Sequence, residues 1–197
     1  GRAGSASGRN GKVLIMIKDQ FNRVHDYLRI SLTERCNLRC TYCMPEEGIL
    51  LRPRSEFMRA EEVIEMAKIF VSLGVKKIRL TGGEPLVRKD AKKIIAELAC
   101  LPIELAISTN GILVDEYIGT LKSSGIKSIN VSLDSFKKEK FNSITRRDYF
   151  DKVISNIDLL LKEKFHVKIN TVLIKGVNDD EICDFVAWTR DKNVHVR

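Results

Sequence analysis

Long apolar runs are missing from this sequence. The longest obvious one, from Val13 to Ile17, has five residues, whereas a membrane-spanning helix needs about 20. The first residues also lack the apolar core of a signal peptide. We therefore expect no membrane partner. The 197 residues, of which 44% are hydrophobic, are enough to bury a core, as one domain or as a large part of a bigger one.

A framework of paired cysteines is missing as well. The five cysteines are an odd number, and two of them, Cys100 and Cys183, stand alone on predicted helices. This pattern argues against a secreted, disulfide-linked fold and for a reducing compartment. We expect a cytoplasmic protein, or one of the mitochondrial matrix if the source is eukaryotic.

Acidic residues are outnumbered by basic ones. The chain has 34 Lys and Arg against 26 Asp and Glu, a formal charge of +8, and such an excess favours an anionic partner. No nucleic-acid motif or interleaved aromatic pattern accompanies the charge, so we expect no nucleic-acid partner. The basic clusters at 137–140 and 146–147 are interpreted as a solvated face.

Strand and helix patterns alternate along most of the chain. Residues 1–18 are predicted to be a disordered leader and N-terminal extension, and 19–197 one core. In the short turn before the first strand, Asn22 can take a left-handed conformation. The spacing of apolar residues predicts strands at 27–32, 77–80, 103–108, 128–133 and 167–174, and a sixth that begins at 194. It predicts helices at 60–73, 89–100, 114–123, 150–164 and 180–191, where 150–164 is the main one of several helical segments after residue 135.

Alternating strands and helices indicate right-handed crossovers and a parallel sheet. Parallel strands covered by helices on both faces are almost continuously hydrophobic, but each strand here has one polar face. We therefore predict an α/β fold, a partial, open TIM-like barrel of parallel β/α units that is truncated at the sixth strand. The alternative is a mixed sheet with a solvated polar face. The polar face carries Arg29, Ser31, Arg79, Thr81, Ser108, Asn130, Ser132, Lys168 and Asn170.

Three thiols follow the first predicted strand within one short loop, at Cys36, Cys40 and Cys43. Thiolates select zinc or iron-sulfur clusters, and a structural zinc site usually has four protein ligands in two pairs. No second pair follows, so the loop predicts a 4Fe-4S cluster with one iron left for a ligand that is not protein. A non-enzymatic zinc-binding module is the alternative. Its fourth ligand would be His25, His166 or His195.

The spacing Cys-x3-Cys-x2-Cys, with an aromatic residue at Tyr42, resembles the radical S-adenosylmethionine enzymes. The resemblance implies that the cysteines hold three irons of the cluster. The fourth iron is then chelated by the amino and carboxylate groups of S-adenosylmethionine. An electron passed through that iron cleaves a carbon-sulfur bond and gives a 5'-deoxyadenosyl radical.

Further candidate site residues lie at the carboxyl ends of the predicted strands, where parallel barrels place their active sites. In the turn that starts Gly82-Gly83-Glu84, the glycines allow close backbone approach. The Glu84 carboxylate can accept a hydrogen bond from the ammonium group of S-adenosylmethionine. Asn130 and Ser132 are candidates to bind its ribose or carboxylate.

Three cations, Arg29, Arg79 and Lys168, are predicted to face the barrel interior. Like charges this close repel one another unless an anion lies between them, and guanidinium groups bind phosphate oxygens in pairs. The pattern favours a polyanionic substrate. The structural alternative pairs each cation with a carboxylate such as Asp134 or Glu84.

Several segments also resemble the molybdenum cofactor biosynthesis protein A family, the GTP 3',8-cyclases. The matching segments are 27–45, 77–86, 109–111, 129–134 and 167–170, within a likeness that runs from about residue 19 to the last residue. The resemblance implies the first step of molybdenum cofactor (molybdopterin) biosynthesis, in which GTP becomes (8S)-3',8-cyclo-7,8-dihydroguanosine 5'-triphosphate. The radical removes a ribose hydrogen, and the ribose carbon attacks C8 of guanine.

The same resemblance implies roles for individual residues. Cys36, Cys40 and Cys43 would bind the cluster. Contacts to S-adenosylmethionine would come from Tyr42, Gly83 and Ser132. Contacts to GTP would come from Arg29, Arg79, Ser108 and Lys168. A homodimer is a further possibility. The runner-up is another radical S-adenosylmethionine enzyme that acts on a different phosphorylated substrate.

The chain departs from the family pattern at three places. Ser108 stands where the family commonly has threonine, and Asn22 where it commonly has glycine. The family also carries a second three-cysteine cluster in its C-terminal part, which holds the guanine base, and this sequence stops before it. We therefore expect one cluster within this chain, and no complete cyclisation of GTP by these 197 residues alone.

Overall fold

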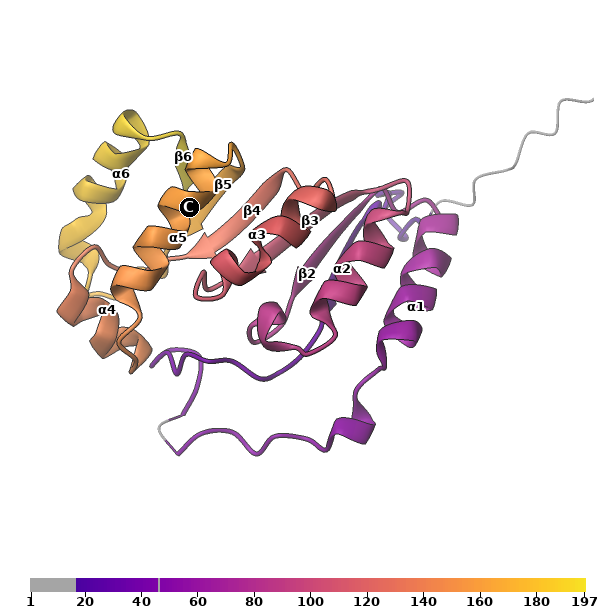
Figure 1. Ribbon diagram of the computed structural model, residues 1–197, viewed down its shortest axis with the longest axis horizontal. Coiled ribbons are helices and arrows are strands. Elements are labelled where there is room, and N and C mark those ends of the chain that lie inside the picture. Colours follow the sequence, from indigo (N-terminus) through magenta and orange to yellow (C-terminus); the bar gives the residue numbers. More distant parts are fainter. Residues whose placement is uncertain (1–16, 46) are drawn as a thin grey trace, which may run out of the picture.

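Six parallel strands form one sheet in the order of the sequence, β1-β2-β3-β4-β5-β6 (Figure 1). The computed structural model describes residues 17–45 and 47–197. The leader predicted at 1–18 lies outside the described residues except for its last two. The strands are β1 (Tyr27–Ser31), β2 (Lys77–Thr81), β3 (Glu104–Thr109), β4 (Ser128–Ser132), β5 (His166–Asn170) and β6 (Val194–Val196).

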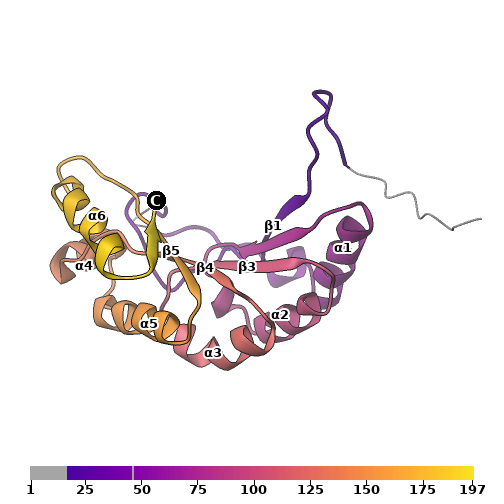
Figure 2. The same cartoon turned by 90° about the horizontal axis from the view of Figure 1, so that it is seen from above.

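The helices cover one face of this sheet, and the other face is open and concave (Figure 2). Because each crossover returns to the neighbouring strand on the same side, the layers form part of a barrel and not a doubly wound sheet. The predicted fold class is confirmed. The helices are α1 (Ala60–Ser72), α2 (Ala91–Ala99), α3 (Val114–Ser123), α4 (Lys138–Thr145), α5 (Phe150–Lys162) and α6 (Ile182–Asp191).

The core lies between the strands and the helices. Alternate residues such as Ile78, Leu80, Ile107, Ile129 and Val167 point to the helices and are fully buried. Each contributes about 1.5–3 kcal/mol by leaving water. This layer fixes the strand register, because a slip by one residue would turn the apolar set to the open face.

The opposite face carries the polar residues in rows across the strands. Arg29 in β1 lies beside Arg79 in β2. One layer further along, Ser108, Asn130 and Lys168 are register partners on β3, β4 and β5. The prediction of a polar inner face is confirmed by this register.

One predicted strand is too long. The apolar run to residue 174 predicted a strand over 167–174, but β5 ends at Asn170. Beyond it, the Val172 amide donates to the Asp134 carboxylate at 2.9 Å, and the Ile174 amide donates to the Asn178 side chain at 2.7 Å. Side-chain acceptors therefore replace the backbone hydrogen bonds that a neighbouring strand would supply. Leu173, between these two residues, is exposed.

Local signals account for the ends of other elements. Before α1, the Arg59 amide donates to the Glu62 carboxylate at 2.7 Å, so Glu62 satisfies the helix entrance that Arg59 alone would leave open. Asn22 has φ +62°, the left-handed conformation predicted for it. None of the described helices is long and apolar enough to cross a membrane.

Candidate functional site

The cysteine loop is held by the C-terminal end of α4. The last carbonyls of a helix have no hydrogen-bond partner inside the helix. Here the cysteine loop supplies amide donors to two of these carbonyls. The Arg39 amide donates to the Thr145 carbonyl at 3.0 Å, and the Thr41 amide donates to the Ile144 carbonyl at 2.9 Å. The loop that carries the thiols is therefore fixed from its middle to a helix that follows β4.

A second anchor joins the loop to the end of β4. The Tyr42 hydroxyl donates to the Asp134 carboxylate at 2.8 Å. Burial raises the pKa of Tyr42 and that of Asp134, so this hydrogen bond lies in a poorly solvated place. Tyr42 itself is about half exposed, and its predicted contact with S-adenosylmethionine stays a prediction.

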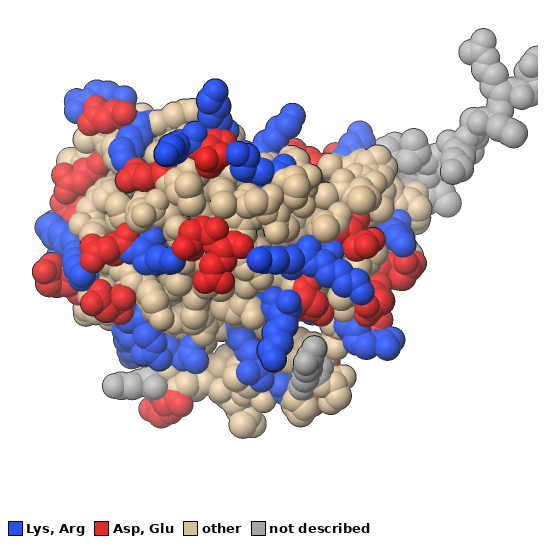
Figure 3. All heavy atoms as spheres, in the orientation of Figure 1, with Lys and Arg blue, Asp and Glu red and all other residues tan. Residues whose placement is uncertain are grey.

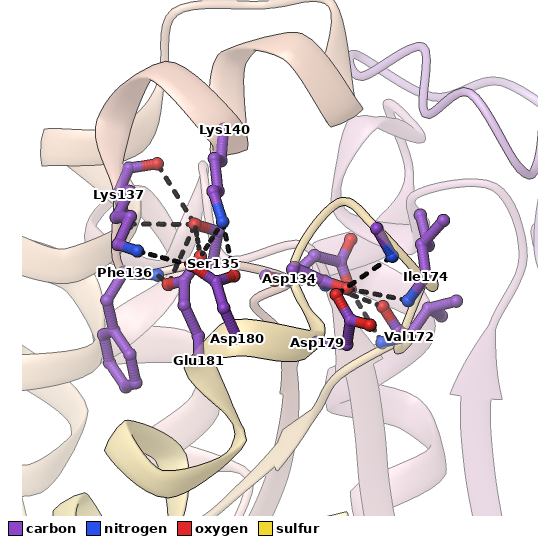
Figure 4. Close-up of polar contacts among 12 residues, drawn as sticks. Asp134, Ser135, Phe136, Lys137, Lys140, Val172, Ile174, Asp179, Asp180 and Glu181 are labelled. Atoms are coloured by element: carbon purple, nitrogen blue, oxygen red, sulfur yellow. Dashed lines mark hydrogen bonds and ion pairs between the residues drawn. The ribbon is translucent and has the colours of Figure 1, made fainter.

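The residues after β4 are tied in turn to the start of α6 (Figure 4). Glu181 is fully buried and accepts from the Ser135 hydroxyl at 2.8 Å and from the Phe136 amide at 2.7 Å. The Asn178 side chain donates to the Asp134 carbonyl at 2.6 Å. This network fixes the backbone of Asp134. It thereby also fixes the carboxylate that accepts the hydrogen bond from Tyr42 of the cysteine loop.

The three thiols are free, with Cys36 and Cys40 half-buried and Cys43 exposed. Burial raises the pKa of Cys40 to about 11, and Asp134 and the other two thiols add to this effect. Such thiols become ligands when a cationic centre binds their sulfurs as thiolates and their protons are released to solvent. Among the described residues, no three His, Cys, Asp or Glu side chains already lie placed to hold a metal ion. The donor set itself, three soft thiols on one loop, fits an iron-sulfur cluster.

Asn110, which the sequence analysis did not single out, reaches the first thiol from the loop after β3. Its side-chain amide donates to Cys36 Sγ at 3.7 Å and to the Asn37 side chain at 2.7 Å. Its sequence signals were an Asn-Gly pair after a strand, which is typical of many turns, and its place in segment 109–111, which resembles the cyclase family but assigned Asn110 no role. Asn110 is nearly fully buried, so its position beside the sulfur is well defined.

The glycines after β2 let two loops run against each other. The Gly83 amide donates to the Thr33 carbonyl at 2.6 Å. A Cβ atom on Gly83 would lie 2.4 Å from the Arg35 carbonyl oxygen, and one on Gly82 would lie 2.5 Å from the Thr33 carbonyl oxygen. Gly82 also has φ +146°. The turn predicted to bind S-adenosylmethionine thus lies directly beside the chain that leads into the cysteine loop.

Replacing Gly83 by Ala is expected to destabilise the protein by about 1–3 kcal/mol, because the new methyl group forces two backbones apart. Urea unfolding measures this loss. Gly119→Ala in α3 is the matched control, since its Cβ would meet nothing within 4 Å. It should stabilise by about 0.5–1 kcal/mol. Equal stabilities for the two variants would contradict the close approach.

Glu84 is fully buried, and protein groups already bind its carboxylate. It accepts from the Thr109 hydroxyl at 2.8 Å and from the Asn110 amide at 2.6 Å. Burial raises its pKa to about 7, although these hydrogen bonds favour the carboxylate. The structure therefore places Glu84 as the support of the loop that carries Asn110. Its predicted contact with the S-adenosylmethionine ammonium stays a prediction.

Glu84→Gln is expected to remove a pH-dependent part of the stability. The folded pKa of about 7 lies above the ordinary 4.5, so the contribution is complete below about pH 4.5 and is lost as the pH rises through 7. Over this window the unmodified protein should lose up to about 3 kcal/mol relative to the variant. Urea unfolding across the pH range measures the difference, with the exposed Glu116→Gln as control. Parallel pH profiles would rule the contribution out.

The cations on the concave face are not paired with the carboxylates considered as partners. Asp134 and Glu84 make the other contacts described above. The Arg79 guanidinium donates instead to the Tyr27 hydroxyl at 2.7 Å and to Ser108 at 3.4 Å. The pKa of Lys168 is lowered, first by burial and then by nearby cations that include Arg79. Neither Arg29 nor Lys168 forms an ion pair with a described carboxylate.

Two buried polar atoms on this face also lack a hydrogen-bond partner within the described residues. Neither Asn130 Oδ1 nor Ser128 Oγ has a hydrogen-bond partner within the described chain, and leaving such an atom unpaired is costly. Ser132 and Ser108 lie close in register and are partly exposed. The concave face thus offers cations, hydroxyls and an unpaired amide oxygen to a polar, anionic ligand.

Comparison with known proteins agrees with this geometry. The Radical SAM superfamily model matches residues 30–189, and the chain belongs to that superfamily. Family membership implies a 4Fe-4S cluster and S-adenosylmethionine as cofactors. Native anSMEcpe with bound AdoMet has the same fold over 86% of this chain and 51% of its own, with a TM-score of 0.68 and 22% identity. For Streptococcus suis SuiB bound to S-adenosylmethionine the shares are 87% and 50%, with a TM-score of 0.57 and 16% identity.

Curated relatives are more similar in sequence. The chain is 50% identical over 192 residues to the mitochondrial GTP 3',8-cyclase of Arabidopsis thaliana, covering 96% of this chain and 49% of that protein. It is 51% identical over 185 residues to molybdenum cofactor biosynthesis protein 1 of Dictyostelium discoideum, covering 92% and 29%. The GTP 3',8-cyclase of Listeria welshimeri is 43% identical, covering 92% and 56%. The chain thus spans 29% to 56% of the length of these relatives.

Proposed function

We propose that this chain is the radical S-adenosylmethionine core of a GTP 3',8-cyclase, which carries out the first step of molybdenum cofactor biosynthesis. The observation that carries the proposal is the cationic concave face beside the thiol loop. Arg29 and Arg79 are register partners on adjacent strands, and Lys168 lies on the same face. Like charges at this spacing are destabilising unless an anion binds them. The names of the relatives support GTP as that anion.

The residues divide into two binding sets. Arg29, Arg79 and Lys168 bind the triphosphate, since guanidinium forks and an ammonium group suit its oxygens. The Ser108 hydroxyl contacts the same substrate from the next strand. Together they orient the ribose of GTP toward the thiol loop.

The second set binds the cofactors. Cys36, Cys40 and Cys43 hold the single cluster assigned to these residues. When bound, the cluster and S-adenosylmethionine supply the radical that removes a ribose hydrogen. Residues of two loops and one strand shape the cofactor pocket and keep water from it. They are Tyr42, Gly82, Gly83, Glu84, Asn130 and Ser132.

Within the second set, Asn130 and Glu84 act differently. Asn130 Oδ1 is buried and lacks a partner in the described chain, so it is available to a donor group of the cofactor. Glu84 contributes through the backbone of the next loop, because its oxygens already accept from Thr109 and Asn110. Replacing Asn130 therefore removes a direct contact, whereas replacing Glu84 disturbs the loop.

A second candidate is another radical S-adenosylmethionine enzyme with a different phosphorylated substrate. The same three cations favour it, because their chemistry selects phosphate and not guanine. Competition for binding between GTP and inorganic triphosphate separates the two. Equal affinities would favour the second candidate.

The experiment that tests the proposed cofactor site is anaerobic reconstitution with iron and sulfide, followed by metal analysis. The electron paramagnetic resonance spectrum of the reduced protein is then compared with and without S-adenosylmethionine. An iron-sulfur signal that changes when the cofactor is added supports the proposal. Stoichiometric zinc without iron would instead support the zinc-binding module.

A further inference from the structure

A basic pocket lies on the cysteine loop but apart from the concave face. It has a volume of about 520 Å³ and reaches Cys36. Four arginines line it, two from the cysteine loop and two from the end of α4. They are Arg35, Arg39, Arg146 and Arg147. None of the concave-face cations assigned to GTP is among its lining residues, so the pocket is a separate feature of the thiol loop.

These arginines differ from most basic residues near them. Lys137 and Lys140 both pair with Asp180, and Lys138 pairs with Asp151. None of the four arginines forms an ion pair with a described carboxylate. Two acidic residues, Glu34 and Glu47, also line the pocket. Glu34 is already bound by Arg52, and Glu47 forms no ion pair with a described residue. The pocket therefore keeps an excess of positive charge, four arginines against two carboxylates.

Two of the arginines are structural, and two keep most of their guanidinium donors available to a partner. Arg39 donates to the Leu38 carbonyl at 2.8 Å, and Arg146 donates to the Met44 carbonyl at 3.3 Å, so both brace the cysteine loop. Arg35 and Arg147 are exposed, and within the described residues Arg147 donates only to the carbonyl of its neighbour Arg146, at 2.8 Å. In the same view as the ribbon, Lys and Arg prevail among the charged spheres of the lower part of the molecule, below a band in which both signs alternate (Figure 3).

Exposed apolar side chains lie beside this charge. Leu50 is 99% exposed, and Ile49 and Leu51, which line the pocket, are also exposed. Arginine together with exposed apolar residues is typical of protein interfaces, whereas nucleic-acid interfaces are more polar. The combination favours a protein partner with an acidic surface.

We propose that this pocket and its rim are the docking surface for an acidic, one-electron carrier protein that reduces the cluster. The inference rests on the proposed function, because the cluster must receive an electron before S-adenosylmethionine is cleaved. In this step the reduced carrier would give up one electron, and the cluster that Cys36, Cys40 and Cys43 would hold would accept it. No bond forms or breaks in the protein. The partner's negative surface meets Arg35 and Arg147, which places its redox centre beside the thiol loop.

Charge complementarity of this kind acts mainly on the association rate. Arg35→Gln combined with Arg147→Gln should slow cluster reduction by a flavodoxin, a small acidic protein that carries FMN. We expect the second-order rate constant to fall about tenfold at low ionic strength and to lose much of its salt dependence. Reduction by dithionite, which needs no docking, should keep its rate.

The matched control removes two charges at the opposite end of the barrel. Lys127→Gln combined with Lys162→Gln changes exposed lysines that form no ion pair within the described residues. Stopped-flow absorbance follows the cluster, and surface plasmon resonance measures the Kd of the flavodoxin. Both should be unchanged in the control, and the Kd should rise about tenfold in the arginine variant.

The outcomes separate the inference from the proposed function. If the unmodified protein forms no cluster that dithionite reduces, the proposed function fails and the inference fails with it. If the cluster forms but flavodoxin reduces the arginine variant as fast as the control, only the inference fails. Tighter binding of single-stranded RNA than of flavodoxin, lost in the arginine variant, would also overturn it and identify a nucleic-acid surface instead.

Discussion

Replacing Cys40 by Ser is expected to abolish assembly of the iron-sulfur cluster. The three thiols are the soft donors of this site, and a hydroxyl does not replace a thiolate as a ligand for iron. Cys40 lies between Arg39 and Thr41, the residues that pin the loop to α4. Its loss leaves two thiols in an intact loop. We expect iron affinity to fall by more than about 100-fold, measured as bound iron and sulfide after anaerobic reconstitution.

Cys100 provides the matched control for this prediction. It is a free, exposed thiol at the end of α2, and its side chain donates only to the Ala96 carbonyl. Cys100→Ser should retain full iron and sulfide and the same electron paramagnetic resonance spectrum. Bound iron in the Cys40→Ser protein at the level of the control would contradict the assignment of the loop. An unchanged melting temperature in both apoproteins shows that the effect is one of ligation.

The second large effect is expected at the cations of the concave face. Arg79→Ala combined with Lys168→Ala should weaken GTP binding by about 100-fold to 10,000-fold, because each charged hydrogen bond contributes about 1.5–3 kcal/mol. Isothermal titration calorimetry with GTP measures the loss. Neither residue forms an ion pair with a described carboxylate, so their removal leaves no partner charge buried. It also removes the mutual repulsion of two cations. Stability should therefore be kept or increased.

A double replacement on the outer layer controls for the change in net charge. Lys152 in α5 and Arg190 in α6 are exposed, and each pairs with a carboxylate at the surface. Lys152→Ala combined with Arg190→Ala should leave GTP affinity unchanged. If the Arg79 and Lys168 variant also binds GTP normally, the concave face serves another substrate, and the second radical S-adenosylmethionine candidate is favoured.

The fold was predictable because its signals are local. Apolar alternation in strands and spacing in helices located every strand and five of the six helices, including α3, whose ends match the prediction. The short α4, at Lys138–Thr145, was anticipated only as an unspecified helical segment, since its few apolar positions carry a weak period. The error at β5 arose because residues 172–174 are as apolar as a strand. Whether they pair depended on Asp134 and Asn178, which only the folded chain brings to them.

The site was predictable to the extent that motifs carry it. The thiols and the glycine turn stand out by residue type and spacing, and the structure brings their loops together. Asn110 did not stand out, because its partner Cys36 is 74 residues away and no local pattern connects them. Glu84 was singled out by its charge, but only its burial shows that its carboxylate faces the protein.

The basic clusters at 137–140 and 146–147 differ in their surroundings in a way that the sequence did not predict. They were interpreted together as a solvated face, and this holds for the lysines, which pair with surface carboxylates such as Asp180. Arg146 and Arg147 instead line the pocket on the cysteine loop. Sequence separates the two groups poorly, since the difference lies in which carboxylates the fold brings near them.

The two backbone hydrogen bonds between the cysteine loop and α4 make the loop and the helix a single cooperative unit. α4 has only eight residues, too few to be stable alone, and its last carbonyls accept from Arg39 and Thr41. Whatever orders the loop must therefore also suppress fraying of the helix, and whatever melts the helix must release the loop. Metal binding by the loop should consequently slow the hydrogen exchange of the α4 amides and make this segment more resistant to proteases.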